Sequence, residues 1–137
     1  MNQHKYLRAY MAGIVIPTIV LLLAVTVFTL YRYVYNVPVP VERLIIFPMA
    51  VVPNLWGLWN ILHAALPPRL RLSLGLHGAL LPLLLIPLAI ALVSILNFPV
   101  PPFVVHIFPV AAPIALIGYY LVWKYPVAFL NRVAAID

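Results

Sequence analysis

The sequence contains no cysteine and only two acidic residues, Glu42 and Asp137, among its 137 residues. Without cysteine the chain can form no disulfide and can offer no thiolate to an iron–sulfur cluster or a zinc site. Charged residues make up 7% of the sequence, whereas a soluble domain carries roughly a quarter. The chain therefore has too few polar side chains to face water, and we expect the lipid bilayer to be its solvent and first partner.

Four long stretches of the sequence contain no charged residue, and short segments with charges separate them. These stretches are 21 to 25 residues long, and a helix needs about 20 apolar residues to cross the hydrocarbon core. Strands of a membrane barrel would alternate polar and apolar residues, which these stretches do not do. The sequence predicts an all-α integral membrane protein, a single transmembrane domain over residues 1–137. Its four expected spans cover residues 9–31, 44–65, 72–96 and 103–123.

The basic residues divide unevenly between the two sides of such a bundle. Short links make neighbouring helices antiparallel, so Arg32 and Arg43 fall on one side. The other six basic residues, Lys5, Arg8, Arg69, Arg71, Lys124 and Arg132, fall on the opposite side. The positive-inside rule then places both termini in the cytoplasm, and we expect a prokaryotic inner membrane.

The net charge of +6 has a membrane explanation. The basic residues lie beside apolar runs, which favours contact with anionic lipid headgroups over binding of nucleic acid. Lys5 and Arg8 before an apolar run are also typical of a signal peptide. The run is long, however, and "YRYVYN" after it lacks the small residues of a cleavage site, so we expect the first helix to be retained.

A proline-rich apolar segment occurs twice, at a constant offset of 61 residues. Residues 36–60 and 97–121 are identical at ten of 25 aligned positions, including Asn-x-Pro-x-Pro, Phe-Pro-x-Ala and a glycine. These matches predict a 2+2 tandem repeat of helical hairpins, with units at about residues 8–68 and 69–129. Recurrence of proline-rich caps at membrane turns is the alternative. In either case we expect Asn36 and Asn97 to end the preceding helices in the left-handed conformation.

Prolines and small residues are frequent within the expected spans. Seven of the fifteen prolines lie there, and an interior proline favours a kink. Passive curvature of the helices is the simpler interpretation of these kinks, and a bent, gated or cavity-forming bundle is the alternative. Small residues spaced four apart permit close approach of helices, within one chain or between copies. The small residues that we expect to form such packing faces are Gly75, Ala79, Ala111, Ala115 and Gly118.

The second span carries an unusual set of polar and aromatic residues. Trp56, Asn60 and His63 follow helical spacing and therefore share one face. An amide in hydrocarbon seeks a partner, so this face is expected to meet another helix, a ligand or another subunit rather than lipid. The full candidate packing or ligand face of this span comprises Asn54, Trp56, Gly57, Trp59, Asn60 and His63.

Histidines offer one possible cofactor site. We expect His63 and His77 at similar depth on consecutive helices, where two facing imidazoles could hold a b-type haem. Two interfacial histidines bonded to the backbone or to headgroups are the simpler explanation. We therefore expect no cofactor and no metal.

The polar inventory argues against catalysis. The expected spans contain no charged residue, and the chain has no carboxylate pair, phosphate-binding loop or nucleophile with an arranged base. We expect a non-catalytic helix-packing, assembly or accessory subunit that forms a homo-oligomer or joins a membrane complex. The alternatives are a small transporter or channel for an uncharged or lipophilic solute, a haem-binding redox subunit, and, last, a lipid-modifying enzyme.

Overall fold

The computed structural model describes residues 3–136, and all regular secondary structure in that range is helical. Four helical stretches are long and apolar enough to cross a membrane: Lys5–Tyr33, Val41–Ala65, Leu74–Ile95 and Pro102–Val133. The prediction of an all-helical chain with four spanning lengths is confirmed. These four lengths indicate an integral, multi-pass membrane protein.

The helices belong to two compact units. The first unit contains the chain up to Leu66 and again from Phe129 onward, and the second runs from Pro67 to Ala128. The chain thus passes from the first unit to the second after Leu66 and returns after Ala128.

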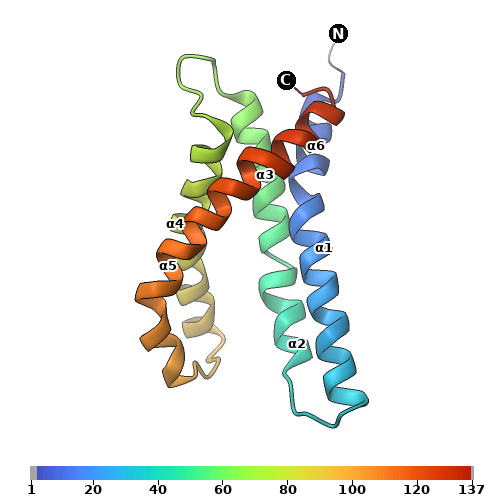
Figure 1. The fold of residues 1–137 in the computed structure, drawn as a ribbon, viewed down its shortest axis with the longest axis vertical. Coiled ribbons are helices and arrows are strands. Elements are labelled where there is room, and N and C mark those ends of the chain that lie inside the picture. The colour runs from blue at the N-terminus through green and yellow to red at the C-terminus, as the bar shows by residue number, and fades with distance from the viewer. Residues whose placement is uncertain (1–2, 137) are drawn as a thin grey trace. The chain divides into compact units, whose positions relative to one another are not determined.

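In the first unit, α1 (Lys5–Tyr33) and α3 (Val52–Ala65) lie side by side (Figure 1). Their backbones meet at Gly13. A Cβ atom at Gly13 would lie 2.7 Å from the carbonyl oxygen of Trp56 and 2.9 Å from Cα of Gly57. Neither backbone atom can move aside as a flexible side chain could, so the approach of the two helices requires glycine here.

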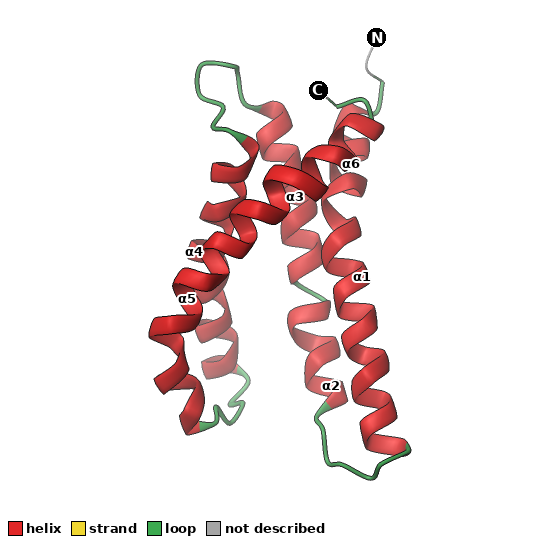
Figure 2. Cartoon of the chain, viewed as in Figure 1, coloured by secondary structure: helices red, strands yellow, loops and turns green. Residues whose placement is uncertain are grey.

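The second span is interrupted rather than continuous. It begins with α2 (Val41–Leu44) and a π-helical turn, η1 (Ile45–Met49), within which Phe47 takes extended angles of φ −148° and ψ 126°. A short non-helical link then leads into α3 (Figure 2). Pro53 falls in the first turn of α3, where a missing N–H is tolerated. The Asn54 side chain donates to the carbonyl oxygen of Ala50 at 2.8 Å, which gives one carbonyl in this link a partner.

In the second unit, α4 (Leu74–Ile95) packs against α5 (Pro102–Val122) and the π-helical turn η2 (Trp123–Val127). Glycines of α4 receive aromatic rings. A Cβ at Gly75 would lie 2.9 Å from the ring of Tyr120, and a Cβ at Gly78 would lie 1.9 Å from the ring of Trp123. After η2, the short helix α6 (Ala128–Val133) returns the chain to the first unit.

The links after α1 and after α4 begin with an asparagine in the same backbone conformation. Asn36 and Asn97 have φ angles of 53° and 50°, so the expected left-handed conformation is confirmed at both. The following N–H groups turn back to the helices just ended: Val37 donates to Tyr31 O at 2.9 Å and Phe98 to Val93 O at 3.0 Å. These bonds satisfy carbonyls that a helix end leaves without partners.

The glycine contacts give opposite expectations for two equivalent substitutions. Gly13→Ala should lower the free energy of unfolding by about 1–3 kcal/mol, because the new methyl group meets backbone. Gly118→Ala should be neutral or stabilising by up to about 1 kcal/mol, because alanine favours helix and, within residues 3–136, its methyl group would meet no atom beyond the local helix backbone within 4 Å. Unfolding of the monomer in mixed micelles measures both. Equal effects of the two variants would contradict this packing.

Candidate functional site

Asn60 of α3 and Asn131 of α6 form a reciprocal amide pair within the first unit. Asn60 Nδ2 donates to Asn131 Oδ1 at 2.7 Å, and Asn131 Nδ2 donates to Asn60 Oδ1 at 3.0 Å. Asn60 Nδ2 also donates to the main-chain oxygen of Ala9 in α1 at 2.7 Å. Each asparagine is 1% exposed. One side chain therefore joins three helices.

The surroundings of the pair make its bonds hard to replace. Ala9, Ala12, Ala64 and Ile136 form the buried apolar cluster of this unit, against which Ile61, Leu130 and Ala134 pack. Small side chains let the three helices approach closely enough for the amides to meet. An amide left without partners in such a place is costly, whereas bonds across membrane helices contribute about 0.6–2 kcal/mol. The pair therefore holds α6 against α1 and α3.

Other residues of the predicted face also meet α1. Gly57 is buried, and a Cβ there would lie 2.4 Å from the ring of Tyr10. The hydroxyl of Tyr10 donates to the side-chain oxygen of Asn54, whose position is exposed. Trp56 is buried and Trp59 is half-buried. The structure therefore brings the polar residues of α3 into contacts within the first unit.

The two candidate haem ligands belong to different units. His63 is buried in the first unit and His77 in the second, where its ring lies edge-on to Trp123 at 6.0 Å between centroids. Within residues 3–136, no group of three or more histidine or acidic side chains could hold a metal ion. A haem between the two imidazoles stays a prediction.

The small residues of the second unit fall into two groups. Gly75 is buried and Ala79 half-buried on α4, close to α5. On α5, Ala111 and Gly118 are exposed and Ala115 is half-buried. At 3.6 residues per turn, these three lie on the side of α5 opposite Tyr120, the residue that packs on Gly75. The small-residue face of α5 therefore points away from α4.

Several residues at these contacts were not singled out from the sequence. Gly13 lies within a long apolar run, and Trp123 is only the last residue of the fourth expected span. Asn131 offered one signal, an uncharged amide within the apolar stretch "AFLNRVAAI". Nothing local could have identified its partner, because Asn60 lies 71 positions away.

The contacts of the described residues are those of helix packing. Amide side chains bond across helices, glycines make room for neighbouring backbone or aromatic rings, and apolar side chains cover the outward faces. Comparison with protein-family models, with curated proteins and with solved structures finds no match for this chain.

The amide pair predicts how the end of the chain responds to substitution. Asn60→Leu should undock α6, because it removes all three bonds and leaves Asn131 unpaired in an apolar site, at about 1–3 kcal/mol. The chain has no native cysteine, so a single Ile136→Cys probe, at a position 6% exposed, can report docking. Maleimide should label this probe several-fold faster in the Asn60→Leu background.

A matched control for this labelling is Asn54→Leu, which removes an amide from the same helix at an exposed position. It should leave labelling of the Ile136→Cys probe unchanged. Equal labelling rates in the Asn60→Leu and unsubstituted backgrounds would show that the amide pair does not hold the segment.

Proposed function

We propose that this chain is a non-catalytic multi-pass membrane protein whose role is assembly within the bilayer. It associates with copies of itself through the small-residue face of α5, formed by Ala111, Ala115 and Gly118, and in that form can act as a subunit of a larger membrane complex. The observation that carries this proposal is the environment of the five glycines.

Four of the five glycines mark a close approach inside one unit. An added Cβ at Gly13, Gly57, Gly75 or Gly78 would lie within 3 Å of a neighbouring atom. At Gly118 it would meet no neighbouring helix or side chain within 4 Å in the part of the chain that the structure describes. Glycine disfavours a helix by about 1 kcal/mol relative to alanine. Elsewhere in this chain, close contact offsets that disadvantage. Close packing of a helix from another subunit would offset the helix-disfavouring effect of Gly118 in the same way.

Lipid alone would cover an ordinary apolar face, but this face has the form that membrane helices use to associate. Small residues let backbones approach, so that dispersion and weak Cα–H contacts hold the helices together. The face does not include Tyr120, which packs against α4. Another helix could therefore bind to this face without separating α5 from α4.

We further infer the arrangement of the chain in the membrane. Both termini lie in the cytoplasm of a prokaryotic cell, because six of the eight basic residues fall on that side. The two hairpins are copies of one ancestral unit. The identical left-handed conformation of Asn36 and Asn97, each followed by Val/Phe-Pro-Val-Pro, supports that origin.

Self-association can be measured by energy transfer between donor- and acceptor-labelled copies reconstituted in liposomes. Wild-type protein should show transfer that falls only when the lipid-to-protein ratio is raised strongly. Gly118→Leu should weaken association by about tenfold, or about 1.4 kcal/mol, because its side chain separates the two backbones.

The control for this experiment is Ala91→Leu, an equivalent enlargement at an exposed position of α4. It should leave energy transfer as in the wild type. Loss of transfer in both variants, or in neither, would contradict assembly through α5.

A further inference from the structure

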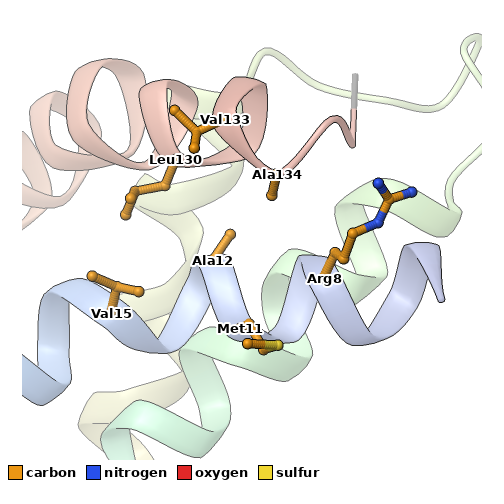
Figure 3. Close-up of a pocket in the computed structure, with 7 residues that line it drawn as sticks. All are labelled: Arg8, Met11, Ala12, Val15, Leu130, Val133 and Ala134. Atoms are coloured by element: carbon orange, nitrogen blue, oxygen red, sulfur yellow. The ribbon is translucent and has the colours of Figure 1, made fainter.

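A groove in the first unit combines an apolar lining with a single arginine. It lies between the first turns of α1 and the end of the chain, and its volume is about 240 Å³. Arg8 and Val15 lie towards opposite ends of it along α1, with Ala12 between them, and Leu130 and Val133 of α6 lie across from them (Figure 3). For comparison, an apolar cavity of about 150 Å³ can hold a benzene molecule.

Arg8 brings a guanidinium to the groove, and one of its donors has no partner among the described residues. The side chain is half-buried, and its Nε atom is shielded from solvent with no hydrogen-bond partner within residues 3–136. A shielded donor without a partner is unfavourable, and exceptions of this kind call for an explanation. The guanidinium presents a planar set of donors that matches phosphate oxygens. A phosphate bound in the groove would accept from the terminal nitrogens of this guanidinium and so give the half-buried cation an anionic partner.

The charge around the groove favours an anion. Lys5 lies three residues before Arg8 and therefore on the same face of α1. Glu42, the one acidic residue that the structure describes, is paired with Arg32 at the other end of α1. Within residues 3–136, no carboxylate of the first unit competes for this basic end.

We propose that the groove is a binding site for one anionic phospholipid of the adjoining leaflet. The phosphate lies on Arg8 with Lys5 nearby, and the first part of one acyl chain lies along Ala12, Val15 and Leu130. Basic pockets between membrane helices on the cytoplasmic side are suited to such headgroups. An anionic lipid is preferred over a zwitterionic one, because choline would bring a positive charge towards the basic cluster. Since α6 forms one wall, the site exists only when the Asn60–Asn131 pair is closed.

Native mass spectrometry of the detergent-purified protein, titrated with phosphatidylglycerol or phosphatidylcholine, tests this proposal. Wild type should bind one phosphatidylglycerol in preference to phosphatidylcholine. Arg8→Gln should weaken that binding by about tenfold, equivalent to about 1.4 kcal/mol. Val133→Trp, at an exposed wall position, should reduce occupancy by filling the groove.

Arg69→Gln is the matched control, because Arg69 is the exposed counterpart of Arg8 at the same offset of 61 residues and loses the same charge. It should bind phosphatidylglycerol as the wild type does. Equal weakening in Arg8→Gln and Arg69→Gln would reveal diffuse charge attraction and overturn the site. So would equal affinity for the two lipids, or full binding by a folded Val133→Trp variant.

Discussion

The amide of Asn60 is the interaction on which the first unit depends. Both hydrogens of its nitrogen are used, one by Ala9 and one by Asn131, and its oxygen accepts in return. Water cannot replace these bonds in an apolar interior, so they hold α1, α3 and α6 in one arrangement. The bonds thereby hold α6, which follows the four long helical stretches, beside the first turns of α1. The wall that α6 gives to the groove at Arg8 follows from that closure.

The two hairpins reach close packing by different means. In the first, Gly13 lets the α1 and α3 backbones approach directly, and in the second Gly75 and Gly78 make room for aromatic rings. Neither device uses the outward face of α5. Four glycines lie at close contacts, whereas Gly118 meets no neighbouring helix among the described residues. This difference is the basis on which we propose assembly with another helix as the role of the chain.

The sequence predicts the spans well because charge-free runs of sufficient length have few other uses. It also predicts the left-handed asparagines, since Asn before Val-Pro or Phe-Pro ends a helix locally. The interruption at Phe47 was not foreseen, because prolines at positions 48 and 53 are compatible with a smooth curve or a break. The return of α6 was not foreseen either. Its six residues carry no periodic signal, and its anchor is a tertiary contact spanning 71 positions.

The most direct measurement is the mass of the complex after detergent-free extraction from its own membrane into native lipid discs. We predict a complex that contains two or more copies of the 15.3 kDa chain, alone or together with a partner subunit. Discs that contain one 15.3 kDa chain with lipid and no other protein would contradict assembly as its role. The membrane used should be one in which the protein is normally abundant.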